Sequence, residues 1–379
     1  MAQSKAPVLV DYDSIVMGAE QYQQYIPELK NKRVALLVNH ASLVGNRHLV
    51  DVLLSKKIDM VKIFSPEHGF RGKMDAGEIF EEGTDPQSGL PIVSLYGKHK
   101  KPSEEDLQDV DILLIDLQDV GTRFYTYIST MSLAMEACAE YNVEVIVLDR
   151  PNPNGYFVDG PVLKKEYQSF VGMHPVPVVY GMTIGEYAQM VNGEGWLKDG
   201  VQCELQVVNL AKYNRNMIVK LKVAPSPNLP NWKSVYLYPS LCFFEGTVVS
   251  VGRGTKYPFQ VYGHPDLPFG DFSFLPQSIP GKSSHPKLQG EVCYGQYLSG
   301  YAGNYTNNPA EINLTWLISS YKYLSSKTEF FNNYFDKLAG TEELKKQIIA
   351  GKSPQDIRES WQEGLEAFKK IREKYLLYD

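Results

Sequence analysis

Cysteine is scarce in this chain of 379 residues, and no two cysteines form a Cys-x-x-Cys pair. The four that occur are Cys138, Cys203, Cys242 and Cys293. Their wide spacing argues against a disulfide framework and against a structural zinc site. Each cysteine is therefore predicted to be a buried thiol.

The chain carries little excess charge of either sign. Its 38 Lys and Arg residues are nearly balanced by 44 Asp and Glu residues, which gives a formal net charge of −6. Proteins that bind nucleic acid through its phosphates are usually strongly basic, so that class of partner is excluded. Apolar residues make up 43% of the chain and charged residues 22%, which is typical of a folded globular protein.

Long apolar runs are also missing. Val110–Leu117 and Val143–Leu148 are strand-sized and fall well short of the roughly 20 residues that cross a bilayer, so no membrane span is expected. Met1–Val10 has neither the basic start nor the long apolar segment of a leader peptide. A chain that begins at a mature terminus would look the same, so the compartment stays open.

Several motifs of cofactor-dependent and nucleophilic enzymes are absent. Gly252-x-Gly254 lacks the third glycine and the following helix of a dinucleotide fingerprint, and no Walker A sequence occurs. The seven histidines include no His-Glu-x-x-His pattern, and no Gly-x-Ser-x-Gly elbow offers a serine nucleophile. We therefore expect neither a cofactor nor a metal.

What is present is an alternation of short β-branched runs with helical patterns over the first half of the chain. Runs such as Asp111–Asp116 are apolar on both faces, which is typical of a parallel strand covered by helices. Leu49–Lys57 and Ser129–Tyr141 are the predicted crossover helices. The pattern predicts an α/β fold with a doubly wound, mostly parallel sheet. The predicted strands are Arg33–Asn39, Met60–Ser65, Pro91–Tyr96, Val110–Leu117 and Val143–Asp149.

The composition changes near residue 235. Aromatic residues, Pro and Gly then follow in quick succession, and a helical periodicity returns from Asn313 to Tyr378. We therefore expect a catalytic domain over residues 1–235 and a smaller α+β domain over residues 236–379 that closes the cleft. The predicted core contacts of the helical segment are Trp316, Tyr323, Trp361, Leu365 and Phe368.

Three of the predicted strands end in polar loops marked by Gly or Pro, at residues 65–72, 116–123 and 149–155. Ligands of doubly wound sheets bind beyond the carboxyl ends of the strands, so these loops are expected to converge. Glu67 lies in the first loop. The flanking Phe64 and Phe70 are expected to raise its pKa by desolvation, which a general acid needs at neutral pH. A single Glu in such a loop is otherwise more often part of a surface turn.

The second loop offers two further carboxylates after the most hydrophobic strand. Asp116 is a candidate for the second catalytic group, with the equal alternative that it caps a turn or pairs with Arg123. Arg123 is suited to bind a substrate carboxylate, although an internal ion pair with Asp119 is nearly as well supported.

A second Glu and a second Arg lie in the aromatic-rich region, in a stretch predicted to form a strand, a tight turn and a strand. Glu245 and Arg253 are predicted either to pair across that turn or to close the crevice from the second domain. The expected substrate-binding residues are therefore His68, Arg71, Gln118, Asp119, Arg123, Tyr125, Glu245 and Arg253.

The same loops resemble a known family. Together they are similar to the NamZ/YbbC family of exo-β-N-acetylmuramidases, formerly a domain of unknown function, over residues 34–378. The segments that carry the resemblance are Phe64-Ser-Pro-Glu-His-Gly-Phe-Arg-Gly72, Leu114-Ile-Asp-Leu-Gln-Asp-Val-Gly-Thr-Arg-Phe-Tyr-Thr-Tyr127, Asp149-Arg-Pro-Asn-Pro153, Phe244-Glu-Gly-Thr247 and Gly252-Arg-Gly-Thr255.

The resemblance implies a Rossmann-like domain with a smaller C-terminal domain, and release of N-acetylmuramic acid from the non-reducing ends of peptidoglycan glycans. It maps the catalytic Glu of the family onto Glu67. It also implies a periplasmic or secreted location, while a cytoplasmic one and a homodimer both stay open.

Glycoside cleavage also fits the residues themselves. It needs a protonated carboxyl group at the leaving oxygen and a group that stabilises an oxocarbenium-like transition state. Glu67 would be the acid, and the partner would be Asp116, Asp119, Glu245 or the 2-acetamido group of the substrate. Retaining, inverting and substrate-assisted routes therefore all stay open.

Substrate choice and mode of attack can also be stated as expectations. N-acetylmuramic acid carries a lactyl carboxylate that N-acetylglucosamine lacks, and Arg123 and Arg253, followed by Arg71, are the candidates to bind it. Cleavage from the chain end is expected because a covered crevice forms a pocket, with residues 263–281 as one wall. A peptidoglycan-binding protein without turnover is the alternative, and an oxidoreductase is less favoured because phosphate-binding glycines are missing.

Overall fold

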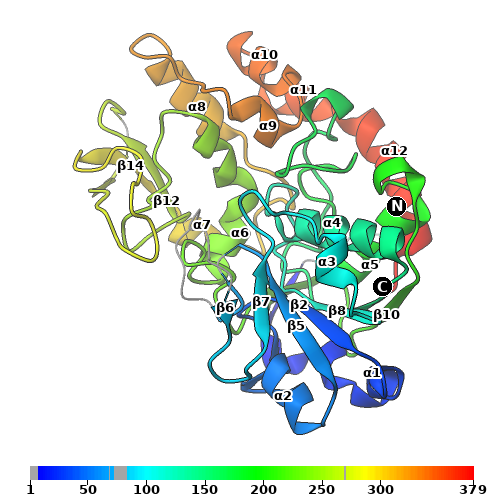
Figure 1. Cartoon of the computed structure of the whole chain (residues 1–379). Helices are drawn as coiled ribbons and strands as arrows, with labels where there is room; N and C mark the ends of the chain where they lie inside the picture. The colour runs from blue at the N-terminus through cyan, green and yellow to red at the C-terminus, as the bar shows by residue number, and fades with distance from the viewer. Residues whose placement is uncertain (1–6, 68, 72–82, 269) are drawn as a thin grey trace.

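The computed structural model describes residues 7–67, 69–71, 83–268 and 270–379 (Figure 1). At its centre lies a seven-stranded sheet with the strand order β10-β9-β8-β2-β5-β7-β6. All neighbours in this sheet pair in parallel except β6 and β7. The predicted α/β class and all five predicted strands are therefore confirmed. The strands are β2 (Val34–Val38), β5 (Met60–Ser65), β6 (Gly83–Thr84), β7 (Pro91–Ser94), β8 (Ile112–Asp116), β9 (Glu144–Leu148) and β10 (Leu205–Val208).

Both faces of this sheet are covered by helices, which explains the continuous apolar runs of its strands. In β2, Ala35 and Leu37 point into one core, whereas Val34, Leu36 and Val38 point into the other. Such a strand needs apolar residues at every position. The helices of the first core are α3 (Glu104–Leu107), α4 (Tyr127–Tyr141) and α5 (Ile184–Gly193), and those of the second are α1 (Tyr22–Leu29) and α2 (Leu49–Ser55).

The sheet is doubly wound. The chain runs from β2 outward through β5 to β7, and then returns to the other side of β2 and runs outward through β8, β9 and β10. The order reverses between β2 and β8, so the carboxyl ends of these two strands form the topological switch point.

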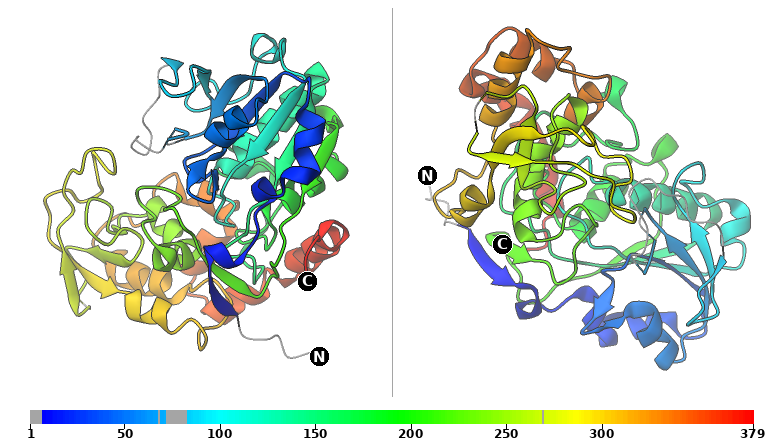
Figure 2. Two further views of the ribbon diagram at one scale, coloured as in Figure 1. Left: turned by 90° about the horizontal axis from the view of Figure 1, so that it is seen from below. Right: turned by 90° about the vertical axis from the view of Figure 1, so that its left-hand side faces the viewer.

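The second part of the chain lies largely above the sheet in Figure 1, and Figure 2 shows it from two further sides. It contains the antiparallel sheet β12-β14-β13, in which β14 is the central strand. Its strands are β12 (Val261–His264), β13 (Phe272–Phe274) and β14 (Cys293–Tyr297). Its helices are α7 (Ser299–Gly303), α8 (Thr315–Leu324), α9 (Phe335–Ala339), α10 (Glu343–Ile349), α11 (Pro354–Glu359) and α12 (Gln362–Arg372).

Helix α6 (Trp232–Leu241) runs through residue 235, where the sequence predicts a domain boundary. The hydrophobic core is continuous across that position. Phe124 packs edge-on against Tyr238 and Phe243, and Phe243 contacts Phe335 of α9. The two parts therefore share one core instead of meeting across a polar interface.

Most of the predicted buried residues of the second part are buried. Trp316, Trp361, Leu365 and Phe368 belong to the core, but Tyr323 is 48% exposed and was assigned to the core wrongly. Tyr323 lies on the exposed side of α8. The helical periodicity of the sequence does not by itself tell which side of this helix faces the core. All four cysteines are free and buried, as predicted.

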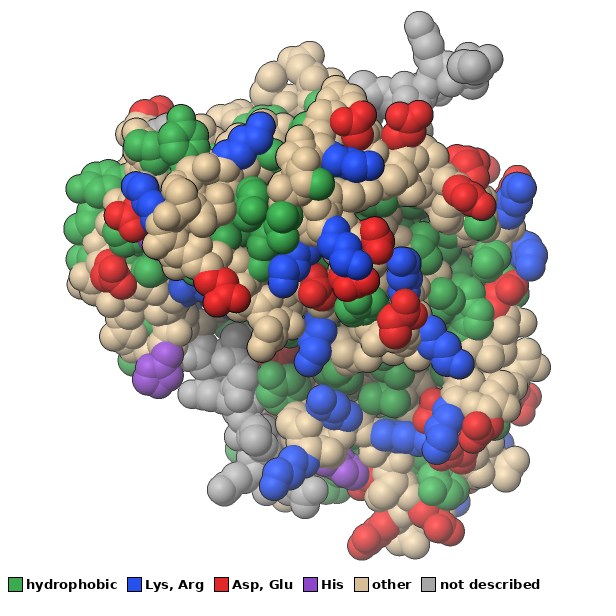
Figure 3. Space-filling view, turned by 90° about the horizontal axis from the view of Figure 1, so that it is seen from above, with side chains coloured by type: hydrophobic (Ala, Val, Ile, Leu, Met, Phe, Trp, Pro, Cys, Tyr) green, Lys and Arg blue, Asp and Glu red, His purple; other side chains and the backbone are tan. Residues whose placement is uncertain are grey.

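Two further pairs of short strands lie outside the two larger sheets. β1 (Val8–Asp11) pairs in parallel with β11 (Met217–Lys220), and β3 (Leu43–Val44) pairs with β4 (Arg47–His48). Within the described ranges, no helix has the length and apolar character needed to cross a bilayer. On the face shown in Figure 3, Lys and Arg side chains lie interspersed with Asp and Glu side chains, in keeping with the small net charge.

Candidate active site

Glu67 lies directly beyond the carboxyl end of β5, where the chain turns sharply. β5 ends at Ser65, and the backbone N–H of Gly69 donates to the carbonyl of Pro66 at 3.2 Å. Gly69 has a φ of +72°, a conformation that glycine adopts without strain. The turn leaves the Glu67 side chain half-buried at the edge of the sheet, as the Pro-Glu-x-Gly pattern predicts.

Three hydroxyl groups surround Glu67. Thr126 Oγ1 donates to its Oε2 at 3.5 Å, and Tyr127 OH donates to its backbone carbonyl at 3.3 Å. Tyr96 follows β7, the strand next to β5, and hydrogen-bonds the Glu67 side chain. Burial, together with the nearby Glu67 carboxylate, raises the pKa of Tyr96 to about 12, so this hydroxyl stays protonated at neutral pH.

Glu67 opens onto a pocket to which both parts of the chain contribute. Arg253 lies in the wall of the same pocket. We call this cavity the Glu67 pocket. Its lining residues are Glu67, Phe124, Tyr125, Thr126, Tyr127, Ser226, Leu229, Tyr238, Arg253 and Phe259.

The apolar neighbours of Glu67 are not the ones that the sequence suggests. Phe64 and Phe70 are buried in the two cores on opposite faces of the sheet. The Phe64 side chain, on β5, points into the core on one face of the sheet. Phe70 packs edge-on against His48, with 5.4 Å between the ring centres. The apolar wall of the Glu67 pocket is formed instead by residues from distant segments, such as Phe124, Leu229 and Phe259.

Glu245 and Arg253 form the predicted ion pair. Arg253 Nε donates to Glu245 Oε1 at 3.0 Å and Nη2 donates to Oε2 at 2.9 Å. The guanidinium also lies 5.0 Å from the centre of the Phe259 ring. The stretch is not a strand pair, because Glu245 lies in a 3₁₀ helix, η5 (Cys242–Gly246). Gly254 has a φ of +76°, and a Cβ there would come within 2.3 Å of the Gln277 carbonyl.

A half-buried lysine, Lys287, holds several backbone carbonyls of η5 and the residues that follow it. Lys287 Nζ donates to the carbonyls of Phe244 at 2.9 Å and Val249 at 3.2 Å, and also to that of Thr247. Burial lowers the pKa of Lys287 to about 8. Burial alone would raise the pKa of Glu245, but the charges of Arg253 and Lys287 hold it below its ordinary value. Two cations and one carboxylate therefore leave one net positive charge in this cluster.

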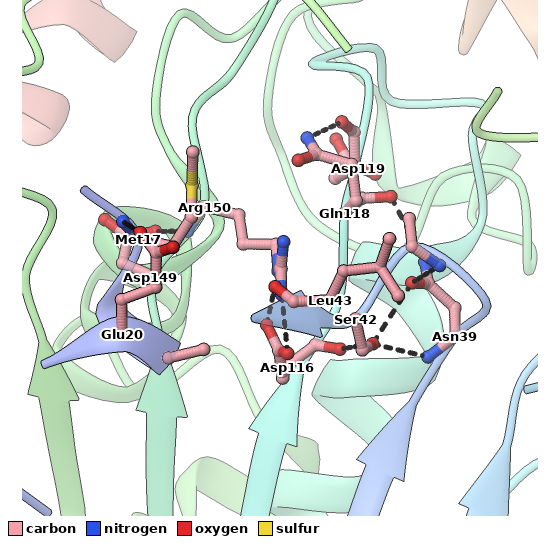
Figure 4. A network of polar contacts seen from close by, with 12 residues as sticks. Met17, Glu20, Asn39, Ser42, Leu43, Asp116, Gln118, Asp119, Asp149 and Arg150 are labelled. Carbon is pink, nitrogen blue, oxygen red and sulfur yellow. Dashed lines mark hydrogen bonds and ion pairs between the residues drawn. The ribbon is translucent and has the colours of Figure 1, made fainter. Parts of the chain in front are cut away.

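Asp116 lies at the switch point and is fully buried in an ion pair (Figure 4). Both of its carboxylate oxygens accept hydrogen bonds from Arg150, with Nη2 at 2.7 Å from Oδ2. Arg150 also donates to the carbonyl of Leu43 at 3.0 Å and to Tyr12 OH. The partner of Asp116 is thus Arg150 and not Arg123. This enclosed pair fills the switch point and does not fit the expected catalytic role of Asp116.

Asp119 and Gln118 are also buried. Asp119 Oδ2 accepts from Tyr180 OH at 2.5 Å and from the backbone N–H of Gly121 at 2.7 Å. Burial raises the pKa of Asp119 to about 7. Gln118 Nε2 donates to the carbonyls of Asp119 and Pro151. Their contacts shape the loop after β8, and neither residue lines the Glu67 pocket.

Arg123 has 0% of its surface exposed, and its guanidinium is committed to backbone carbonyls. Nη1 donates to Pro161 and Val176, and Nη2 donates to Leu338 and Ala339 of α9. Burial lowers the pKa of Arg123 to about 9. This placement corrects the expected ion pair with Asp119, and it leaves no surface on which Arg123 could meet a substrate carboxylate.

The remaining predicted residues divide between the pocket and its surroundings. Tyr125 lines the Glu67 pocket, and its hydroxyl donates to the Pro225 carbonyl at 2.6 Å. Arg71 donates to Asp85 and Asp51 and is absent from the pocket lining. His68 falls outside the described residues. No described residue of 263–281, the predicted wall, lines the Glu67 pocket.

Sequence reasoning assigned no role to several residues around Glu67. Thr126 and Tyr127 lie at the end of the second motif, directly after the predicted strand loop, so their position could have indicated them. Tyr96 ends the predicted strand Pro91–Tyr96. The sequence does not show that this strand lies next to β5, so it does not place Tyr96 near Glu67. Ser226, Leu229 and Tyr238 reach the pocket only through the tertiary fold, and no local pattern in the sequence indicates them.

Comparisons with known proteins match nearly the whole chain. Residues 34–233 match the model of the N-terminal part of the exo-beta-N-acetylmuramidase NamZ, and residues 236–378 match that of its C-terminal part. The peptidoglycan beta-N-acetylmuramidase NamZ of Bacillus subtilis (strain 168) is 39% identical, and the match covers 93% of this chain and 89% of that protein.

Two crystal structures of DUF1343 family proteins from Bacteroides fragilis share the fold. One is 46% identical with a TM-score of 0.88 and covers 96% of this chain and 99% of its own. The other is 29% identical with a TM-score of 0.78 and covers 97% and 99%. Family models and relatives thus agree with the loop motifs over nearly the full length, and the chain belongs to the NamZ family of exo-β-N-acetylmuramidases.

Proposed function

We propose that this chain removes terminal N-acetylmuramic acid from the non-reducing end of peptidoglycan fragments. One observation carries the proposal: Glu67 and Arg253, which lie far apart in the sequence, line the same pocket. A carboxyl group and a cation in one pocket suit a glycosidase whose substrate is an anionic sugar. The family supports the reaction class.

In this proposal Glu67 is the general acid that protonates the glycosidic oxygen while the bond to the anomeric carbon breaks. Among the described residues that line the Glu67 pocket, Glu67 is the only acidic one. We therefore assign the nucleophile to the 2-acetamido group of the substrate, a documented alternative to a second carboxylate. Asp116 and Asp119 keep structural roles.

Arg253 is the proposed partner of the lactyl carboxylate. Its three contacts with Glu245 use Nε and Nη2, and Nη1 takes part in none of them. Lys287 adds a second positive charge behind Glu245. Because the cluster keeps one net positive charge, an anionic sugar is favoured over N-acetylglucosamine, which lacks the lactyl carboxylate.

Hydrolysis of an aryl N-acetylmuramide with a poor leaving group tests the proposal. The wild-type protein should release the aryl alcohol, and correctly folded Glu67→Gln should do so at least about a hundredfold more slowly with nearly unchanged ligand affinity. Glu343→Gln, at an exposed position on α10, is the matched control and should keep the wild-type rate. Binding without release of the alcohol would identify a binding protein, and wild-type rates in Glu67→Gln would remove Glu67 from this role.

A further inference from the structure

The residue that precedes α4 departs from the usual behaviour of a helix cap. A Thr at the N-cap normally accepts a hydrogen bond from a backbone N–H of the first turn. Ser103, Thr183 and Ser353 each do so at their own helices, but Thr126 does not. The Thr126 hydroxyl is directed instead at Glu67, to whose Oε2 it donates at 3.5 Å.

The next residue contacts Glu67 as well. Tyr127 is buried, and its hydroxyl donates to the backbone carbonyl of Glu67 at 3.3 Å. Its ring packs edge-on against Tyr125 at 4.8 Å between ring centres. The start of α4 therefore contacts Glu67 at two points, the backbone and the carboxyl group. A helix packed in the core provides the rigid support that a catalytic side chain needs.

We propose that Thr126 is a positioning residue for Glu67, with a hydroxyl that holds the carboxyl group toward the bond to be cleaved and does not cap α4. This inference rests on the proposed role of Glu67 as general acid. A contact of 3.5 Å is compatible with this role, because catalytic hydrogen bonds are often long before the substrate binds and shorten in the complex.

A series of aryl N-acetylmuramides with leaving groups of increasing basicity separates positioning from mere support of the fold. Thr126→Val removes the hydroxyl and keeps the shape. This variant should lower kcat about tenfold for the substrate with the poorest leaving group and leave KM unchanged. Its kcat for a dinitrophenyl substrate should stay nearly at the wild-type value, because a good leaving group needs little help from an acid. Thr126→Ser retains the hydroxyl and should restore the wild-type pattern.

Thermal stability provides the second readout. Since Thr126 makes no cap bond, Thr126→Val should melt close to the wild-type temperature. The matched control is Ser353→Ala at α11, which loses a capping hydrogen bond and should melt lower while hydrolysing every substrate at the wild-type rate. If the Val variant does not fold, Thr126→Ala takes its place.

Glu67→Gln is measured on the same series. If its loss does not grow with leaving-group basicity, the proposed acid role of Glu67 is wrong. Suppose instead that the loss of rate in Glu67→Gln does grow with leaving-group basicity. The positioning role of Thr126 is then overturned if Thr126→Val shows no loss of rate, or the same loss for every leaving group. Equal loss in Thr126→Ser and Thr126→Val would also overturn it, because the hydroxyl would then not be the acting group.

Discussion

At the scale of single residues, the preference for an anionic sugar depends on Arg253. Arg253→Met should lower kcat/KM for N-acetylmuramic acid substrates by about tenfold to a hundredfold, since a charge-assisted hydrogen bond is lost. The matching N-acetylglucosamine substrate should change far less. Arg71→Met is the control, because Arg71 is also paired with carboxylates but does not line the Glu67 pocket. Equal losses of kcat/KM on both sugar substrates would show that Arg253 supports the fold or the chemical step and does not select the anionic sugar.

A second residue-scale prediction concerns Asp119 and pH. Its pKa is about 7 in the folded protein, whereas an unfolded Asp titrates near about 3.9. Between these values the folded state binds more protons than the unfolded state, so this group makes the free energy of unfolding decrease as the pH rises from about 4 to about 7. Denaturant titrations across that pH range measure the free energy of unfolding, which should fall less steeply with rising pH in Asp119→Asn than in the wild-type protein. Parallel curves for the two proteins would show that Asp119 is already ionised in the fold.

At the scale of elements, the shape of η5 depends on one lysine. Lys287 donates to several carbonyls of η5 and the following residues, so Lys287→Met would remove the donor that the buried residues Thr247 and Val249 share for their carbonyls. The free energy of unfolding should fall by at least about 2 kcal/mol. Lys282→Met, at an exposed position in the same region, should change it by less than about 0.5 kcal/mol. Urea denaturation measures both, and equal stability of the two variants would contradict this role of Lys287.

The elements that the sequence predicted well are those whose signal is local. β2 is a continuous apolar run, as a buried parallel strand requires, and β8 and β9 are apolar except at one end. β5 is apolar except for Lys62 and its last residue, Ser65. The sequence did not predict η5, because Phe243 and Phe244 suggest a strand, whereas the carbonyl of Phe244 is held by Lys287, 43 residues further along the chain.

At the scale of the whole molecule, the place of Glu67 in the fold agrees with the prediction, whereas the contacts of Asp116 and Arg123 do not. Glu67 lies at a strand end facing the second part of the chain, as expected. Asp116 instead pairs with Arg150, and Arg123 is held by carbonyls up to 216 residues away. Backbone carbonyls leave no mark on the sequence, because every residue has one. The hydrogen-bond partners of a buried arginine therefore depend on tertiary contacts, which no local sequence pattern encodes.

The arrangement of the two parts also bears on how a glycan is cut. Residues from both parts line the Glu67 pocket, and a pocket admits a chain end more readily than a chain interior. The pocket therefore suits the proposed removal of a terminal sugar.

The most direct test is to digest a defined peptidoglycan glycan with a non-reducing terminal N-acetylmuramic acid and to measure product sizes over time. The wild-type protein should release the monosaccharide from the first minutes and shorten the glycan from that end, and Glu67→Gln should bind the glycan without releasing sugar. Early internal fragments, or monosaccharide released by Glu67→Gln at the wild-type rate, would contradict a terminal pocket built around Glu67.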